Sequence, residues 1–313
     1  MIGKDLLSIA DLASEDISQL ISQAIDMKAQ GWLSLLERKI MALLFEKPSL
    51  RTRVSFETAM LQLGGHSIYL SPAEVGLGKR ERVPDVARVL GRYVDVITVR
   101  TFSHQTLEAL ASYSPVPVIN ALSDREHPCQ ALADLLTIYE KKGGLRGLAL
   151  AYIGDGNNVA HSLILGASLM GMSFRIASPA GYAIDERIHR QAEEFAAGSG
   201  GEVFSTDEPQ LAARDADIVY TDVWTSMGQE AEAEQRRQVF ASYQVNSQLL
   251  SLAREDAIIM HPLPAHHGEE VAHDILDGPQ SVVLDQAENR LHIQKALLEA
   301  MLGGLDMPLA GCR

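Results

Sequence analysis

Cysteine is scarce in this sequence, and so is any signal for export. The 313 residues include only two cysteines, Cys129 and Cys312, which cannot form a disulfide framework, and no second cysteine or histidine pair lies at zinc-binding spacing. The N-terminus has neither the basic region nor the apolar region of a signal peptide. We therefore expect a cytoplasmic protein whose thiols are reduced.

Long apolar runs and positive charge are also scarce. The uncharged stretch at residues 159–174 contains His161 and several serines and is shorter than the roughly 20 apolar residues of a membrane span. With 27 Lys and Arg against 41 Asp and Glu, the formal net charge is −14, which repels a polyanion. We expect binding to neither membranes nor nucleic acids. A small anion can still bind where arginines and helix N-termini gather, because the local field dominates within about 8 Å.

What the sequence does contain is a regular alternation of two patterns. From residue 39 onward, apolar runs of strand length alternate with helical patterns, which predicts βαβ units around parallel sheets. The predicted strands are residues 40–45, 67–70, 94–99, 116–122, 148–153, 174–178, 202–205, 217–221 and 257–260. We predict an α/β protein with two doubly wound parallel-sheet domains, residues 1–143 and 144–285, followed by a helix within 286–313.

Polar residues follow several of these strands directly. Ligands of parallel sheets bind beyond the carboxyl ends of the strands, so these residues are candidates for a functional site. Two such edges that face each other would form an interdomain active-site cleft. The candidates are Ser49 to Thr52, Arg100 and His127 in the first domain, and residues 155–158, Asp222, residues 226–228 and residues 261–264 in the second.

The segment from Phe45 to Glu57 places hydroxyls and arginines at a strand-to-helix turn. Free backbone N–H groups, hydroxyl donors and a guanidinium group together suit a phosphate, although the spacing alone also fits Ser49 as a simple N-cap. The longer string resembles the carbamoyl-phosphate loop of the aspartate/ornithine carbamoyltransferase family, with Leu50 in place of the usual small residue. Five motifs in the family order extend this resemblance over about residues 5–302.

The resemblance implies a set of carbamoyl-phosphate ligands. In the segment His127-Pro128-Cys129-Gln130, His127 is expected to donate to the carbamoyl carbonyl oxygen, and Gln130 to contact the carbamoyl amino group. The implied catalytic residues are His127, Arg100 and Arg51. The full set of implied ligands is Ser49, Leu50, Arg51, Thr52, Arg100, His127, Gln130 and Arg290.

The acceptor site is implied by two further motifs that point to different branches. The segment from Asp222 to Gly228 is similar to the ornithine branch, but His261-Pro262-Leu263-Pro264 resembles the aspartate branch, since ornithine enzymes usually have cysteine where Pro262 stands. Pro262 has no donor, so the group that deprotonates the acceptor amine stays open. His266 and His267 are candidates, or simply exposed loop residues. The implied ornithine ligands are Asn158, Asp222, Ser226, Met227, Pro262 and Leu263.

Taken together, the resemblance implies transfer of the carbamoyl group from carbamoyl phosphate to the δ-amine of L-ornithine, giving L-citrulline and phosphate. It also implies no metal or organic cofactor, a place in arginine biosynthesis, a homotrimer or an assembly of trimers, and a C-terminal helix packed back on the first domain. Alternatives are a carbamoyltransferase for putrescine, aspartate or another amine, and a non-catalytic protein that binds carbamoyl phosphate or a dinucleotide. The turn at residues 154–158 lacks the third glycine of a dinucleotide fingerprint, which argues against the last.

Overall fold

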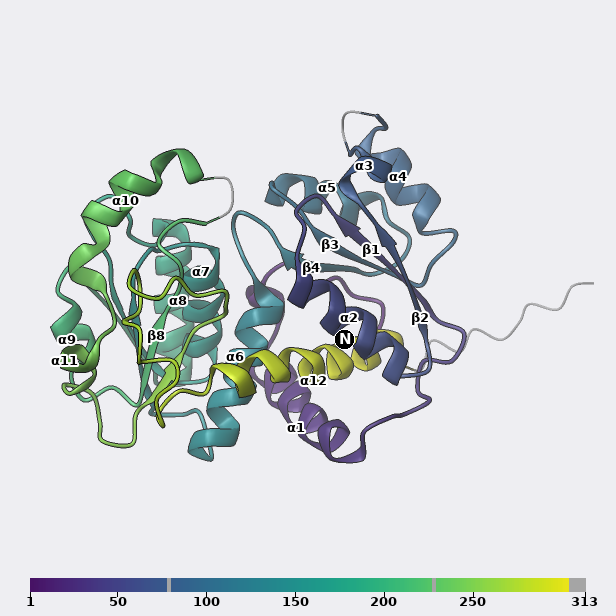
Figure 1. Cartoon of the computed structure of the whole chain (residues 1–313). Coiled ribbons are helices and arrows are strands. Elements are labelled where there is room, and N and C mark those ends of the chain that lie inside the picture. Colours follow the sequence, from purple (N-terminus) through teal and green to yellow (C-terminus); the bar gives the residue numbers. More distant parts are fainter. Residues whose placement is uncertain (78–79, 227–228, 304–313) are drawn as a thin grey trace, which may run out of the picture. The chain divides into compact units, whose positions relative to one another are not determined.

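The computed structural model describes residues 1–77, 80–226 and 229–303 (Figure 1). The chain forms two compact units. One contains residues 1–129 together with the chain from Arg290 onward, and the other contains residues 130–289. None of the described helices combines the length and the apolar character that crossing a membrane requires.

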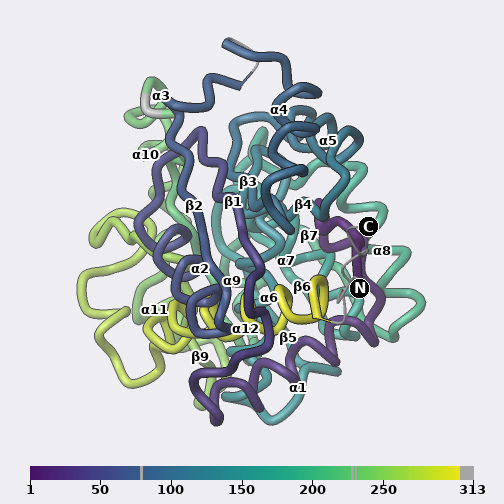
Figure 2. The backbone as a smooth tube through the Cα atoms, turned by 90° about the vertical axis from the view of Figure 1, so that its right-hand side faces the viewer, coloured from purple at the N-terminus to yellow at the C-terminus, as the bar shows by residue number. Residues whose placement is uncertain are grey.

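The first unit is built on a four-stranded sheet of strand order β2-β1-β3-β4, and all three strand pairs are parallel (Figure 2). Leu44, Ile97 and Leu107 belong to its buried core. The strand β4 begins directly after Pro117, which has no N–H to give to a neighbouring strand. In chain order the elements are η1 (Ile9–Asp11), α1 (Ser14–Gln30), β1 (Ile40–Phe45), α2 (Leu50–Gln62), β2 (His66–Leu70), α3 (Pro72–Val75), α4 (Val83–Leu90), β3 (Val96–Arg100), α5 (His104–Tyr113) and β4 (Val118–Leu122).

The second unit is built on a five-stranded parallel sheet of order β7-β6-β5-β8-β9. An aromatic group packs on it, with Trp224 stacked on Phe240 at a centroid distance of 6.0 Å. The elements are α6 (Pro128–Lys142), β5 (Ala149–Ile153), α7 (Asn158–Leu169), β6 (Ser173–Ala177), α8 (Glu186–Ser199), β7 (Glu202–Thr206), α9 (Pro209–Ala213), β8 (Ile218–Thr221), η2 (Glu230–Glu232), α10 (Ala233–Phe240), η3 (Ala241–Tyr243), α11 (Ser247–Leu250), β9 (Ile258–Met260) and α12 (Val283–Leu302).

These elements confirm the predicted fold class of two parallel α/β sheets. The strand β1 has the predicted bounds, and the ends of the other strands either match the predicted ones or differ from them by one or two residues. The helix α12 begins at Val283, three residues before the predicted range of 286–313. Its residues before Arg290 belong to the second unit, and those from Arg290 onward belong to the first.

In the first unit, the later part of α12 holds the end of α1 (Figure 2). Lys295 is 0% exposed, and its Nζ donates to the backbone carbonyls of Met27 at 3.2 Å and Gly31 at 2.6 Å. A cation at this position satisfies the free carbonyls at a helix C-terminus and interacts favourably with the helix dipole. The contact anchors the helix that carries Arg290.

Candidate active site

The predicted phosphate turn is the N-terminus of α2. Ser49 is its N-cap, and the Ser49 Oγ accepts a hydrogen bond from the backbone N–H of Thr52 at 3.3 Å. Arg51 is half-buried in the first turn, whereas Leu50 is 76% exposed. The turn therefore combines a helix N-terminus with a hydroxyl and a guanidinium group, as a bound phosphate requires. The Leu50 side chain adds nothing to that chemistry, so any contact from this position comes from its backbone.

Arg290 joins this turn from α12. Its Nη2 donates to Thr52 Oγ1 at 2.7 Å, and the Arg290 side chain is buried. Helix N-termini favour anions, and a guanidinium group is a strong donor to an anion. Arg290 and the first turn of α2 together therefore suit a bound anion.

Arg100 is the last residue of β3, where the pairing with β4 shifts register between Val99 and Arg100. Such bulges redirect a side chain at the end of a strand. Arg100 is buried, and its Nε finds no hydrogen-bond acceptor among the described residues. Burial, followed by the positive charges of Arg290 and Arg51, lowers the pKa of Arg100 to about 10. Arg100 therefore lies close enough to Arg290 and Arg51 to be repelled by both, which is the arrangement expected around a strongly charged anion.

His127 lies against the same arginines. It is buried at 5% exposure, and burial together with the charges of Arg290 and Arg100 holds its pKa well below the ordinary value for histidine. A lowered pKa keeps the ring neutral at neutral pH, and a neutral imidazole has one N–H donor. His127 is therefore suited to donate a hydrogen bond to a carbonyl oxygen.

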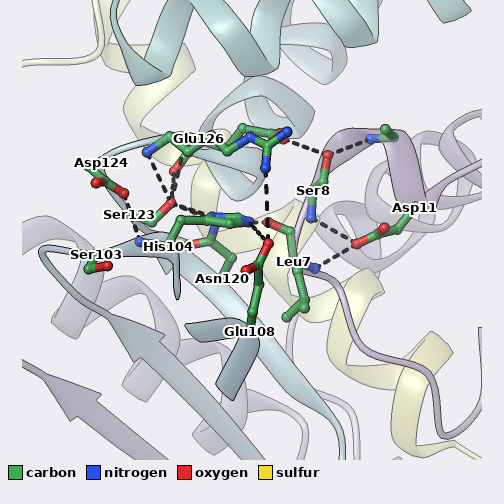
Figure 3. Close-up of polar contacts among 12 residues, drawn as sticks. Leu7, Ser8, Asp11, Ser103, His104, Glu108, Asn120, Ser123, Asp124 and Glu126 are labelled. Atoms are coloured by element: carbon green, nitrogen blue, oxygen red, sulfur yellow. Dashed lines mark hydrogen bonds and ion pairs between the residues drawn. The ribbon is translucent and has the colours of Figure 1, made fainter. Parts of the chain in front are cut away.

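The loop that precedes His127 is held by a hydrogen-bond network (Figure 3). Ser123 Oγ accepts from the backbone N–H of Glu126 at 3.2 Å and lies 2.8 Å from His104 Nδ1. The buried Glu126 carboxylate accepts from Ser8 Oγ at 2.5 Å. These contacts fix the backbone from which His127 projects.

Gln130 lies in the first turn of α6. Its Nε2 donates to Asp134 Oδ1 at 2.8 Å, and Asp134 also accepts from Tyr220 Oη at 2.9 Å and from Gln286 Nε2 at 2.7 Å. Gln130 Oε1 is buried and has no donor among the residues that the structure describes. Because Asp134 fixes the amide orientation, Oε1 is available as an acceptor for an amino group.

In the second unit, Asp222 directly follows β8 and is buried. Its Oδ2 accepts from Asn157 Nδ2 at 2.8 Å, and its Oδ1 accepts from the Val223 N–H at 2.8 Å. Burial raises the pKa of Asp222, whereas His261 and the hydrogen bond from Asn157 oppose this rise. A buried carboxylate held by donors is suited to bind an ammonium group.

Asn157 lies in the run of residues 155–158 that the strand-end rule selects, but the implied ornithine ligands include only its neighbour Asn158. Asn157 is the N-cap of α7, and its Oδ1 accepts from the backbone N–H groups of Val159 at 3.0 Å and Ala160 at 3.1 Å. Asn158, half-buried, is the first residue of the helix. The N-cap role could have been predicted from an Asn between strand and helix patterns, but its bond to Asp222 could not.

The segment after Asp222 is connected to the end of β5 by Arg236, a residue that the sequence analysis did not select. Arg236 of α10 is buried, and its Nη1 donates to Asp155 Oδ2 and to the Trp224 carbonyl, both at 2.8 Å. Ser226 is half-buried, and its backbone N–H donates to Gln229 Oε1 at 3.0 Å. The predicted ligand Met227 lies outside the described residues.

The glycines of the turn at residues 154–158 serve chain packing. A Cβ on Gly156 would lie 2.4 Å from the Ile184 backbone nitrogen, and the Gly156 N–H donates to the Tyr182 carbonyl at 2.8 Å. Gly154 has a φ of +145°, which disfavours any other residue. Close backbone packing thus explains a pattern that, in isolation, resembles a dinucleotide loop.

The predicted turn at residues 261–264 is organised by His261, which is 0% exposed. Its Nε2 lies 3.2 Å from Glu270 Oε1, and its Nδ1 accepts from the Leu263 N–H at 2.9 Å. Leu263 has a φ of +54°, an uncommon value for a residue with a side chain. Pro262 and Leu263 are half-buried. The hydrogen bond to His261 fixes the backbone conformation of both residues, and with it the direction of their carbonyl groups.

One group of possible metal ligands occurs in the described part of the chain. The ligand atoms of His266, Glu269 and Glu270 lie within 4.8 Å of one another. Glu269 Oε1 already accepts from Arg237 Nε at 3.0 Å, and Glu270 Oε1 accepts from the backbone of His266 at 2.5 Å. Glu270 Oε2 is buried, accepts no hydrogen bond among the described residues and lies 3.7 Å from His266 Nδ1.

A four-stranded unit with an arginine-lined anion site and a five-stranded unit with a buried, donor-held carboxylate characterise a two-domain α/β enzyme acting on small charged molecules. Residues 4–140 match the carbamoyl-P binding domain of the aspartate/ornithine carbamoyltransferases, and residues 146–301 match their Asp/Orn binding domain. The chain belongs to the aspartate/ornithine carbamoyltransferase family, and this confirms the predicted family.

Full-length relatives support the same assignment. An ornithine carbamoyltransferase from Bacillus subtilis is 53% identical over 302 residues, which cover 96% of this chain and 95% of that protein. One from Anoxybacillus flavithermus is 52% identical over 304 residues, covering 96% and 97%. The solved structure of ornithine carbamoyltransferase from Pyrococcus furiosus has a TM-score of 0.94 at 51% identity and covers 97% of this chain and 98% of that one.

Proposed function

We propose that the protein transfers the carbamoyl group of carbamoyl phosphate to the δ-amine of L-ornithine, releasing L-citrulline and phosphate. The observation that carries this proposal is the gathering of Arg51, Arg100 and Arg290 around the Ser49–Thr52 turn, next to neutral His127. An anion with an adjacent carbonyl group matches this arrangement. Identity of about half to ornithine carbamoyltransferases over nearly the whole chain supports ornithine as the acceptor.

In this proposal the three arginines and the α2 N-terminus stabilise the phosphate group, which gains charge as it leaves. His127 donates to the carbamoyl oxygen, where negative charge develops during attack. Gln130 Oε1 accepts from the carbamoyl amino group, so that the carbonyl carbon is held in a single orientation. The new C–N bond forms as the C–O bond to phosphate breaks.

Ornithine binds in this proposal through its α-amino and α-carboxylate groups. Asp222 and Ser226 bind the ammonium group, and Asn158 with the Met227 N–H binds the carboxylate. The backbone of Pro262 and Leu263 contacts the δ-amine end. The groups that bind the α-carboxylate select an amino acid over putrescine, which has both amines of ornithine but no carboxylate and would leave these groups unpaired.

The δ-amine must lose a proton before it attacks, because its pKa is about 10.4, like that of lysine. Pro262 has no proton acceptor in its side chain, and both ring nitrogens of His261 already have partners. His266 is exposed on its loop. We therefore assign the first proton, which leaves before the attack, to solvent. The second proton leaves the nitrogen as the C–N bond forms, and we assign it to the departing phosphate, whose oxygens gain basicity as the C–O bond breaks.

Phosphate release tests the function directly. The purified protein is given carbamoyl phosphate with ornithine, aspartate, putrescine or lysine, and both phosphate and the carbamoylated product are measured. We expect rapid release and citrulline with ornithine, and far less with the other acceptors. Equal turnover with putrescine would assign a different acceptor, in keeping with Pro262. Release with none of these acceptors would contradict the proposal.

The remaining assignments follow from the same proposal. We assign carbamoyl-phosphate binding to residues 1–143 with a helix from 286–313, and acceptor binding to residues 144–285. The gap at residues 141–145 between the two family matches supports this division. We also propose a cytoplasmic homotrimer, or an assembly of trimers, that acts in arginine biosynthesis. Exposed apolar side chains on α2 (Leu61) and on the edge strand β2 (Ile68) support self-association.

A further inference from the structure

We propose that Asn157 is a positioning residue of the acceptor pocket, which sets the orientation of the Asp222 carboxylate relative to the N-terminus of α7. This inference rests on the proposed function, because it concerns how the α-amino acid acceptor is held. It adds a residue that the ornithine ligands implied by the sequence do not include.

The geometry gives Asn157 two simultaneous tasks. Its Oδ1 accepts from the first backbone N–H groups of α7, those of Val159 and Ala160, and its Nδ2 donates to Asp222 Oδ2 at 2.8 Å. Tyr152 Oη adds a longer contact of 3.3 Å to Oδ1. Because the helix N–H groups fix which end of the amide is oxygen, the NH₂ group has to face Asp222.

The two residues that Asn157 connects follow adjacent strands. The strands β5 and β8 are paired in parallel, with Ile153 opposite Thr221, so Asn157 and Asp222 leave the same edge of the sheet. The next residue after Asn157 is Asn158, the proposed ligand of the acceptor carboxylate. Asn157 therefore sets the spacing between the group that binds the ammonium and the group that binds the carboxylate of one α-amino acid.

The charges around Asp222 make the hydrogen bond from Asn157 Nδ2 important for the stability of the Asp222 carboxylate. His261 stabilises the Asp222 carboxylate, whereas Glu270 opposes it. The buried Tyr152 and Asp155 also lie within electrostatic reach of Asp222. A buried carboxylate among other acidic groups depends strongly on each hydrogen bond that it accepts.

The chain offers substitutions that separate capping from positioning. Asp and Ser are about as good as Asn at an N-cap, so Asn157→Asp and Asn157→Ser keep the start of α7. Asp cannot donate, and it places a second carboxylate beside Asp222. The hydroxyl of Ser is too short to serve both tasks. Asn246 is a matched control, because its Oδ1 caps α11 by accepting from the Leu249 N–H at 3.0 Å.

The test compares steady-state kinetics and thermal melting of wild type, Asn157→Asp, Asn157→Ser and Asn246→Asp. We expect both Asn157 variants to raise the KM for ornithine about tenfold or more, while the Kd for carbamoyl phosphate stays near wild type and the proteins still unfold in a single melting transition. In Asn157→Asp the acid limb of kcat/KM for ornithine moves to higher pH, since two adjacent carboxylates share a proton more readily. Asn246→Asp keeps wild-type kinetics.

A KM for ornithine and a pH profile close to wild type in Asn157→Asp would overturn the inference and leave Asn157 as a helix cap only. An equal loss of carbamoyl-phosphate binding would overturn it as well, because the defect would then not be confined to the acceptor. Failure of the proposed function has a different signature. In that case the wild-type protein itself forms no citrulline from ornithine.

Discussion

Arg290 Nη2 lies 2.7 Å from Thr52 Oγ1, although the two residues are 238 positions apart in the sequence. The contact brings the last helix of the chain to the N-terminus of α2, where Arg51 and Ser49 also lie. The charge of Arg290 lowers the pKa of both Arg100 and His127. A single anion site therefore forms from four separate segments.

Arg51→Ala is expected to reduce turnover by about 100- to 1,000-fold, the usual effect of removing one donor that stabilises developing charge. Arg51 is only half-buried, so the fold should survive, as circular dichroism can verify. Arg53→Ala is the control, because Arg53 is exposed and pairs with Glu57 on the helix surface at 3.0 Å. A nearly normal rate in Arg51→Ala would remove the phosphate assignment.

His127 is expected to remain neutral as the pH falls. Since burial and two arginines lower its pKa, the ring binds a proton only at a pH below the ordinary histidine value of about 6.5. Nitrogen NMR of the imidazole rings from about pH 8 to about pH 6 should therefore show the neutral pattern for His127 throughout. The signal is assigned by its loss in His127→Gln. A titration midpoint near the value of free histidine would contradict this prediction.

Asp222→Asn is expected to raise the KM for ornithine by at least about tenfold, because a neutral amide binds an ammonium group less strongly than a carboxylate does. Carbamoyl-phosphate binding, measured by calorimetry, should change little. The raised pKa of Asp222 gives the sign of the pH dependence. Ornithine binding by wild type weakens as the pH falls towards that pKa. In the variant, this weakening of ornithine binding at low pH should be absent. An unchanged KM would exclude Asp222 from the acceptor site.

Arg236→Met is expected to lower the free energy of unfolding by about 3–5 kcal/mol, the typical cost of leaving a buried charge without its partner. The unpaired group is Asp155, whose pKa burial already raises. The loss should shrink as the pH falls, because a protonated Asp155 no longer requires the cation. Urea unfolding at two pH values measures this, with Arg237→Met on the exposed face as the control. Equal destabilisation by both variants would argue against the buried pair.

Leu61→Glu and Ile68→Glu are expected to weaken self-association without unfolding the chain, because both side chains are about half exposed in a single copy. Size-exclusion chromatography with light scattering measures the mass. The wild type should elute as a trimer or a multiple of one, and the double variant as smaller species. A wild-type monomer would contradict the proposed assembly, and an unaffected double variant would place the interface elsewhere.

Strand positions could be predicted because buried parallel strands are continuous apolar runs. Residues 40–45 are all apolar, and β1 occupies these same positions. The start of α12 could not be predicted in this way, because several of its buried residues are polar. Gln286, Asn289 and Lys295 are each 0% exposed, so the hydrophobic period that marks a helix is interrupted where the helix is most enclosed.

The sequence by itself determined the alternation of strands and helices, the parallel sheets and the family, because these depend on local periodicity and on motifs of neighbouring residues. Only the tertiary structure decided which polar groups meet. Asn157 reaches Asp222, and Arg236 reaches Asp155, across elements whose separation along the chain carries no information about distance in space. Hydrogen bonds and ion pairs act over a few ångströms, so such partners become visible only when packing has brought their segments together.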